Sequence, residues 1–318
     1  MNERTTKGAL AGEKRAVDGL LLLDKPQGLT SNAALQRVKG LFRARKAGHT
    51  GSLDPLATGM LPICFGQATK VSGYLLGANK LYRVTACFGA QTDTADADGR
   101  IIAEAGGNAL VSREALEGVL EQFLGEIEQI PPMYSALKRG GRRLYELARE
   151  GKEVPREPRQ VRIHELTIER HHPERPVLRV HCSKGTYIRT LVEDIARAAG
   201  TLGHVAALRR LAVLPFREDG MVTMAQVEAA AARDFRALSE ILLPVDQAIG
   251  DWPCVHLTGS EAYYLLQGHP VMGGSKVEIG LVRLYGDGNR FLGIGEVLTD
   301  GRVAPKRLFV ADGSAAAG

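Results

Sequence analysis

The chain has 318 residues, of which 44% are hydrophobic and 24% charged, and its 41 Lys and Arg against 36 Asp and Glu give a net charge of +5. This balance excludes an intrinsically disordered chain, a collagen-like chain and a disulfide-rich scaffold, and the length suits about two domains. Its apolar runs are too short for a membrane span and its start does not have the form of a signal peptide, so we expect a cytoplasmic protein.

The apolar periodicity predicts an alternation of strands and helices. In chain order it predicts a strand at 19–24, a helix capped by Ser31, a glycine- and proline-rich loop at 48–59, a strand at 61–65, a helix at 69–76, a strand at 81–88, a helix from Ser112 to 124, strands at 161–168 and 177–182, and a helix at 190–199. Because this alternation lacks regular βαβ spacing, we predict an α+β fold with a mixed, largely antiparallel sheet and flanking helices.

A second unit begins near Pro253. Short strands within 281–310 are separated by glycine-rich turns, which is typical of a small, mostly-β domain. We therefore divide the chain into a flexible N-terminal tail (1–18), a large domain (19–250), a small mostly-β domain (251–312) and a C-terminal tail (313–318).

Charge is unevenly distributed along the chain. Residues 138–210 hold 17 basic and 9 acidic side chains, a net charge of +8, whereas residues 81–130 hold 3 basic and 9 acidic ones. No acid occurs between Asp24 and Asp54, where six basic residues lie. A basic sector of this kind favours a polyanion as partner, most simply a nucleic acid, with a solvated arginine-rich surface as the alternative.

Sequence patterns for common cofactors and metals are missing. The chain has neither a phosphate-binding P-loop nor a strand-associated G-x-G-x-x-G, and its four cysteines lie at least 23 residues apart. Residues 93–99 resemble part of a calcium-binding loop, but two oxygen ligands are missing, so we interpret this segment as a turn. We expect no cofactor and no metal.

Asp54 stands out as a lone carboxylate in a basic neighbourhood. It lies between Gly51 and Gly59, and Pro55 restricts the next backbone angle. A rigid loop that presents one acid suits a nucleophile or a general base. An ordinary Asp-Pro turn is the alternative.

The run His49-Thr50-Gly51-Ser52-Leu53-Asp54-Pro55-Leu56-Ala57-Thr58-Gly59 resembles the signature of the TruB family of tRNA pseudouridine synthases. Four further motifs agree with the family in order and spacing, namely LLDKP at 22–26, KLYRV at 80–84, SKGTYIRT at 183–190 and LRRL at 208–211. The similarity runs from about Asp18 to Val310, which is nearly the whole chain.

The resemblance implies isomerisation of uridine 55 in the T arm of tRNA to pseudouridine, on a pseudouridine synthase fold followed by a PUA-like RNA-binding domain. It implies a monomer that binds the T stem-loop without a guide RNA, a membrane, a cofactor or a metal, and it makes 138–162 the RNA-gripping segment. The site residues that it implies are Asp54 as the catalytic aspartate, Arg189 paired with Asp54, Tyr187 stacked on the target base, Tyr82 on the other side of that base, His49 entering the T loop, Leu208 lining the pocket, and Lys70 and Asp96 in support.

These roles are physically reasonable. Flipping a uracil out of a folded loop costs a few kcal/mol, and each tyrosine returns about 1–3 kcal/mol by stacking. We expect Arg189 to keep Asp54 ionised. Taken without the family, Tyr82 and Tyr187 suit a core equally well, His49 suits a turn cap, and Leu208 suits the core.

Two other functions remain open at this point. One is a protein that binds or folds tRNA without catalysis, and the other is a guide-RNA-dependent relative that needs partner proteins. The intact Asp54 and Tyr187 argue against the first, and the continuous basic segment at 138–162 argues against the second.

Overall fold

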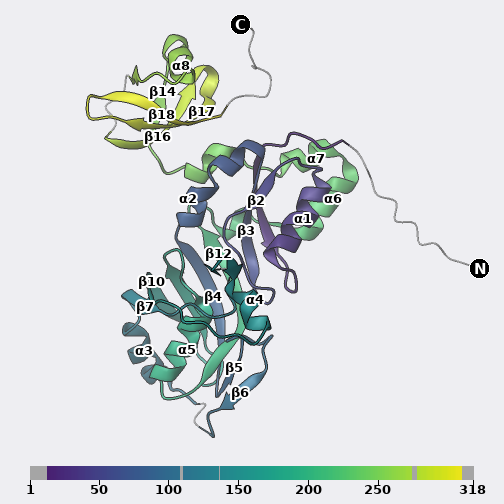
Figure 1. Ribbon diagram of the computed structural model, residues 1–318, viewed down its shortest axis with the longest axis vertical. Helices are drawn as coiled ribbons and strands as arrows, with labels where there is room; N and C mark the ends of the chain where they lie inside the picture. The colour runs from purple at the N-terminus through teal and green to yellow at the C-terminus, as the bar shows by residue number, and fades with distance from the viewer. Residues whose placement is uncertain (1–12, 108–109, 136, 274–277, 310–318) are drawn as a thin grey trace, which may run out of the picture.

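The computed structural model describes residues 13–107, 110–135, 137–273 and 278–309 (Figure 1). A large mixed sheet dominates the first domain and runs in the order β13-β1-β3-β12-β4-β11-β10-β7, with β2 paired to β3. These strands are β1 (Gly19–Lys25), β2 (Ala47–His49), β3 (Thr58–Phe65), β4 (Lys80–Phe88), β7 (Gly125–Gln129), β10 (Arg159–Arg170), β11 (Val177–Cys182), β12 (Gly203–Val213) and β13 (Val222–Thr223). Only the pairs β1–β13 and β3–β12 in this sheet are parallel. The predicted α+β fold with a mixed, largely antiparallel sheet is confirmed.

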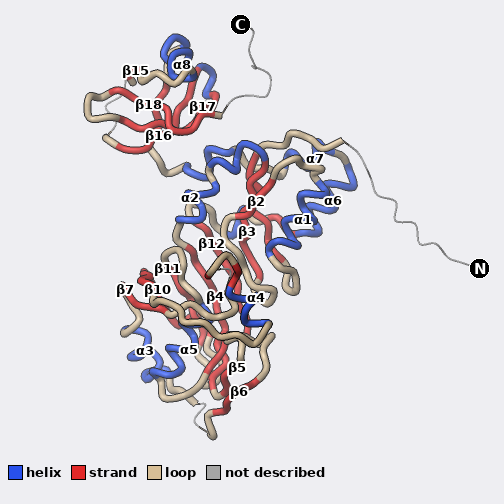
Figure 2. The backbone as a smooth tube through the Cα atoms, in the orientation of Figure 1, coloured by secondary structure: helices blue, strands red, loops and turns tan. Residues whose placement is uncertain are grey.

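Two groups of helices pack on different parts of the sheet (Figures 1 and 2). The helices of this domain are α1 (Ser31–Leu41), α2 (Ser72–Gly77), α3 (Arg113–Glu121), α4 (Leu144–Arg149), α5 (Ile188–Ala198), α6 (Met224–Arg233) and α7 (Phe235–Glu240). Apolar residues of α3 and α5 share a core with β4, β10 and β11, whereas α1 and α6 pack on β1 and β3. Two hairpins lie outside the large sheet, β5 (Ala90–Thr92) with β6 (Ile101–Glu104) and β8 (Lys138–Arg139) with β9 (Arg142–Arg143).

Several predicted helix ends differ from the structure. Thr30, not Ser31, caps α1, because the Thr30 side chain accepts from Ala33 N. Ser112, the predicted first residue of a helix, is the N-cap of α3, and this helix ends at Glu121 rather than at 124. The helix predicted at 69–76 is a 3-10 turn at 66–70 followed by the short α2.

A small β domain follows the large one. It contains β14 (Cys254–His256), α8 (Gly259–Leu266), β15 (Val271–Met272), β16 (Gly280–Gly286), β17 (Arg290–Val297) and β18 (Arg302–Leu308). Its sheet runs β14-β16-β17-β18-β15 and encloses an apolar core of its own. The predicted mostly-β character of this unit is confirmed.

The two domains also share a third apolar cluster. Ile294 and Phe309 from the small domain pack there with Leu20 and Met60 of the large sheet. The Tyr285 hydroxyl donates to Asp246 Oδ2 at 2.7 Å across the same contact. The small domain is therefore packed against the large one.

Cutting the chain after residue 251 should for this reason destabilise the large domain. The cut removes Ile294 and Phe309 from the shared cluster, and each large apolar side chain contributes about 1.5–3 kcal/mol when buried. We expect the melting temperature of the large domain to fall by roughly 10 °C, measured by circular dichroism against the full chain. An unchanged melting temperature would mean that the shared cluster contributes nothing to stability.

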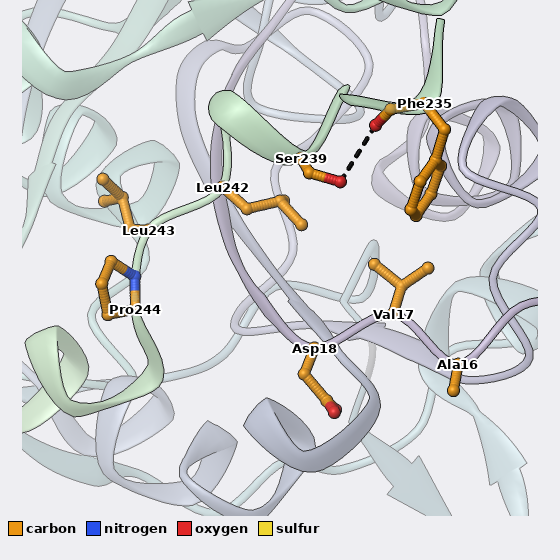
Figure 3. Close-up of a pocket in the computed structure, with 8 residues that line it drawn as sticks. All are labelled: Ala16, Val17, Asp18, Phe235, Ser239, Leu242, Leu243 and Pro244. Carbon is orange, nitrogen blue, oxygen red and sulfur yellow. Dashed lines mark hydrogen bonds between the residues drawn. The ribbon is translucent and has the colours of Figure 1, made fainter. Parts of the chain in front are cut away.

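Residues 13–18 are packed against the large domain, although the flexible tail was expected to extend to residue 18. Val17 is buried, Arg15 forms a β-bridge with Ala44, and the Arg15 guanidinium lies 4.4 Å from the centre of the Phe235 ring. This segment, α7 and residues 242–244 line an open pocket of about 330 Å³ (Figure 3), and none of the predicted site residues lines it. The segment belongs to the packed domain, whereas residues 1–12 and 313–318 lie outside the described residues.

Candidate active site

The loop that carries Asp54 joins β2 to β3, and a side chain of α1 holds its backbone by hydrogen bonds. The Ser31 hydroxyl accepts from Leu53 N at 2.7 Å and donates to Leu53 O at 3.0 Å. Gly28 N donates to Pro55 O at 2.8 Å on the other side of Asp54. Ser31, which was expected to cap a helix, instead holds this loop.

A buried lysine adds a second support beneath the loop. Lys25 Nζ donates to the carbonyls of Pro26 and Leu29, each at 2.8 Å, and lies 3.5 Å from Pro55 O. Burial lowers the pKa of Lys25 to about 8, although the nearby Asp54 carboxylate opposes this shift. The loop therefore rests on a desolvated cation whose hydrogen bonds go to backbone carbonyls.

Arg189, at the start of α5, pairs with Asp54, as the family resemblance implies. Its Nε lies 3.0 Å from Asp54 Oδ2, while its two terminal nitrogens donate to Thr94 O at 2.7 Å and Tyr134 O at 2.6 Å. The Arg189 side chain is 5% exposed and that of Asp54 is 40% exposed. The guanidinium is thus fixed by the protein, and the carboxylate that it orients stays open to a substrate.

Asp96 completes a three-residue network with this pair. Its Oδ2 lies 3.8 Å from Arg189 Nε, and its Oδ1 accepts from Thr94 Oγ1 at 2.7 Å and from Asp98 N at 3.2 Å. Asp96 is buried in the turn at 93–99, so the interpretation of that segment as a turn is confirmed. One guanidinium therefore serves two carboxylates.

The pKa of the Asp54 carboxyl is raised above its ordinary value. Burial is the main cause and the Asp96 carboxylate adds to it, whereas Arg189 and Lys25 act in the opposite direction. The expectation that Arg189 keeps Asp54 ionised left out desolvation and the second carboxylate, which both act against Arg189. A carboxylate whose charge is poorly solvated is a stronger base than one in water.

Tyr82 and Leu208 lie beside the loop on adjacent strands, β4 and β12. Both are 8% exposed and share an apolar cluster with Leu53 and Leu56 of the Asp54 loop. Leu208 also lines a cavity of about 220 Å³ next to Leu56 and Thr58. The structure thus brings Tyr82 and Leu208 beside the Asp54 loop, which agrees with the positions that the resemblance implies.

Tyr187 is held at the start of α5 by a side chain that the sequence did not single out. Tyr187 N donates to Gln129 Oε1 at 2.9 Å, and Gln129 Nε2 donates back to Tyr187 O at 3.3 Å. Gln129 is buried at the end of β7. Its amide fixes the backbone of Tyr187, whose partly exposed ring precedes Arg189 by two residues.

His49 ends β2, at the start of the same loop. Its imidazole is partly buried, and Nδ1 has no hydrogen-bond partner among the described residues. Burial lowers the pKa of His49, and the positive charges of Arg210 and Arg143 add to the effect. Since Arg143 belongs to the basic segment at 138–162, that segment comes close to the Asp54 loop.

Lys70 is not part of this cluster. Its Nζ donates to Leu308 O at 2.7 Å and lies 5.2 Å from the centre of the Phe309 ring. Lys70 therefore ties the small domain to the large one, and its described contacts give no basis for a supporting role beside Asp54.

Sequence reasoning missed Lys25, Ser31, Gln129 and Arg210 as site residues. Lys25 and Arg210 stand inside the LLDKP and LRRL motifs, and each is a charged residue within an apolar strand. That pattern is a usable signal, because a strand buries a charge only when it has polar partners. Gln129 carried no such signal.

Three family profiles together match most of the chain. The N-terminal domain of the TruB family pseudouridylate synthases matches residues 39–188, the C-terminal domain of tRNA pseudouridylate synthase B matches 189–250, and the C-terminal region of pseudouridine synthase II TruB matches 253–309.

Curated relatives agree with these profiles over nearly their whole length. The chain is 51% identical over 296 residues to tRNA pseudouridine synthase B of Ectopseudomonas mendocina and 52% identical over 296 residues to that of Coxiella burnetii. Both alignments cover 93% of this chain and 96% of the relative. The protein of the same name from Escherichia coli O1:K1 is 49% identical over 304 residues, with the same coverage.

Solved structures share the fold. A Cbf5-Nop10-Gar1 complex matches with a TM-score of 0.71 at 24% identity, covering 92% of this chain and 85% of the other. An archaeal box H/ACA sRNP Nop10-Cbf5 complex matches with a TM-score of 0.68 at 22% identity, covering 93% and 87%. At these identities the likeness concerns the fold only.

Proposed function

Because the chain belongs to the TruB family of pseudouridylate synthases, we propose that it isomerises uridine 55 in the T arm of tRNA to pseudouridine, with Asp54 as the catalytic aspartate. The observation that carries this proposal is the Asp54 carboxylate itself. It is 40% exposed, on a loop held by buried hydrogen bonds, and it is oriented by an arginine whose two terminal nitrogens donate to backbone carbonyls. The relatives named above are tRNA pseudouridine synthases, which supports tRNA as the substrate.

The chemistry follows from how these side chains surround one flipped base. Tyr82 on β4 and Tyr187 at the start of α5 supply rings for the two sides of the uracil, which offsets the cost of unstacking it. Asp54 then performs the exchange of the N-glycosidic for a C-glycosidic bond. The exchange consumes no co-substrate, because the uracil detaches, turns and rejoins the same ribose.

Asp54 must be ionised for this work, which sets the direction of the pH dependence, and its raised pKa moves that dependence to higher pH than for an ordinary aspartate. The single-turnover rate should rise with pH through the pKa of Asp54 and fall as acidification protonates it. Rates taken across an acidic pH series at saturating enzyme measure this directly. A rate that increases on acidification would contradict an ionised Asp54.

The basic segment at 138–162 supplies a surface for the tRNA backbone. Arg142, Arg143 and Arg149 are partly or fully exposed on β9 and α4, and Arg143 comes close to His49. Arg143 and Arg149 each stack near the Tyr145 ring, which holds their guanidinium groups in place. We propose that these arginines contact phosphates beside the T loop while His49 enters it.

Replacing Arg142, Arg143 and Arg149 together by alanine should weaken the salt dependence of tRNA binding. The slope of log affinity against log salt should fall by roughly one unit for each phosphate that the variant no longer neutralises. Filter binding between low and physiological salt measures the slope, and Arg236→Gln, an exposed arginine on α7 paired with Glu240, is the control. A triple variant with the wild-type slope would remove this segment from the RNA interface.

The decisive experiment offers the purified chain, without any partner protein or guide RNA, an unmodified tRNA transcript. Pseudouridine should form at position 55 and be absent from a transcript with cytidine at that position. Binding without conversion would favour a tRNA-binding or tRNA-folding protein, and conversion only after partner proteins are added would favour the guide-dependent alternative.

The proposed site of action is the cytoplasm. None of the helices in the described ranges combines the length and the hydropathy that a membrane crossing requires. We further propose that the chain acts as a monomer.

A further inference from the structure

Arg210 occupies a central position beneath the site, although the proposed chemistry makes no use of it. It lies on β12 and is 1% exposed. In the sheet it stands opposite Gly59 of β3 on one side and opposite Tyr82 of β4 on the other. Arg210 therefore links the strand that leaves the Asp54 loop to the strand that carries Tyr82.

The close approach of β3 and β12 at this point requires glycine. Gly59 has a φ of +97°, and a Cβ atom there would lie 2.2 Å from the backbone oxygen of Arg210. A side chain at residue 59 would push the two strands apart. The backbone is thus built to bring Arg210 under the loop.

The guanidinium of Arg210 binds both ends of the Asp54 loop. Its Nε donates at 2.6 Å to the carbonyl of Met60, which follows the loop. Its Nη2 donates at 3.1 Å to the carbonyl of Gly51, which precedes Asp54 in the loop. Its other terminal nitrogen lies 3.5 Å from Ser52 O. A planar fork with donors in fixed directions can hold carbonyls on both sides at once, which a lysine ammonium cannot do with the same geometry.

The positive charge of Arg210 has no acidic partner within 4 Å among the residues that the structure describes. Its hydrogen bonds go to backbone carbonyls, and its guanidinium also interacts with the Tyr82 hydroxyl. A buried cation without a carboxylate is costly, so its presence calls for a use beyond stability. Because it is buried, that use does not include contact with RNA.

We propose that Arg210 is a positioning residue, which fixes the Asp54 loop relative to Tyr82 so that carboxylate and phenol meet the same uracil. This inference rests on the proposed function of the site. It assigns to Arg210 a part in the chemical step and none in holding tRNA.

The test compares Arg210→Lys and Arg210→Met with the wild type in single-turnover rate and in tRNA affinity. Arg210→Met should lower the rate constant by at least about 100-fold and Arg210→Lys by about 10-fold or more, because lysine keeps the charge but not the fork. The Kd for tRNA should change by less than about threefold in both, since neither the tyrosine rings nor the basic segment is altered.

Lys80→Met is the matched control for the loss of a buried cation. Lys80 Nζ also binds two backbone carbonyls, of Leu76 and Ala78, but these lie at the end of α2 and just after it, and neither belongs to the Asp54 loop. This variant should lose thermal stability and keep its rate within about threefold of wild type. If Lys80→Met slows catalysis as much as Arg210→Met does, or if rate and affinity fall together in both Arg210 variants, the proposal is wrong.

An Arg210 variant that does not fold and a wild-type chain that is inactive would have different consequences. Should Arg210→Met fail to fold, the rate-against-affinity comparison for Arg210→Lys decides alone, and an unchanged rate there overturns the proposal. A wild-type chain that converts no uridine would instead refute the proposed function. The role of Arg210 is tested only when the wild type is active, so the two failures can be told apart.

Discussion

Asp54→Asn should abolish pseudouridine formation while leaving tRNA binding largely intact. The amide keeps the shape of the side chain and removes its charge, its basicity and its nucleophilicity. The substrate is a polyanion, so a carboxylate in the pocket disfavours binding and its loss does not weaken affinity. The basic segment and the two tyrosines remain unchanged in this variant.

The fold should tolerate Asp54→Asn. Arg189 keeps Asp96 at 3.8 Å and its two backbone carbonyl partners, so its charge is not left isolated. The carboxyl that is removed has a raised pKa, which means that its ionised form is disfavoured by folding. The melting temperature should therefore stay at or above that of the wild type at neutral pH.

Single-turnover assays with enzyme in excess measure this prediction, because slow product release then cannot mask the chemical step. Asp246→Asn, which removes a partly exposed carboxylate bonded to Tyr285, is the control and should keep the rate. A residual rate in Asp54→Asn above about one hundredth of wild type, a loss of under ~2.7 kcal/mol, would exclude Asp54 as the catalytic group.

Arg189→Lys should have the second largest effect. The guanidinium contacts Asp54 and the carbonyls of Thr94 and Tyr134 at the same time. A lysine ammonium is a single point donor at the end of a flexible chain, so it cannot hold the carboxylate and both carbonyls together. We expect the single-turnover rate to fall by about 100-fold or more and the tRNA Kd to change by less than about threefold.

The control for this substitution lies on the same helix. Arg197 is exposed on α5, where it pairs with Asp194 at 2.7 Å, and Arg197→Lys should leave both rate and affinity unchanged because surface pairs contribute little. Equal losses of rate and affinity in Arg189→Lys would show instead that Arg189 holds a phosphate of the RNA.

The order of residues along the chain was enough to predict the family and the fold class, and it was enough to name the residues at the centre of the candidate site. Asp54, Tyr82, Tyr187 and Leu208 could be named in advance because each stands inside a contiguous motif. Alternating apolar residues likewise predicted much of β4, and a short apolar run predicted β1, since both patterns are visible in a few residues. These features are local in the chain, and local features can be predicted from the order of residues.

Which distant residues meet could be read only from the folded chain. Asp96 joins Arg189 across 93 positions of sequence, and Gln129 reaches Tyr187 across 58. Such pairs depend on strand order and register, because a register shift of one residue moves every side chain of a strand to the other face of the sheet. Local patterns do not contain that information.

The same reason explains why Lys70 was misplaced and why Arg210 was missed. Lys70 was expected near Asp54, but packing of the small domain places its amine on Leu308. Arg210 stands in the LRRL motif, but only the pairing of β12 with β3 and β4 puts it beneath the loop. The pKa of Asp54 was misjudged for a related cause, because desolvation depends on everything packed around a group and a sequence shows only its neighbours along the chain.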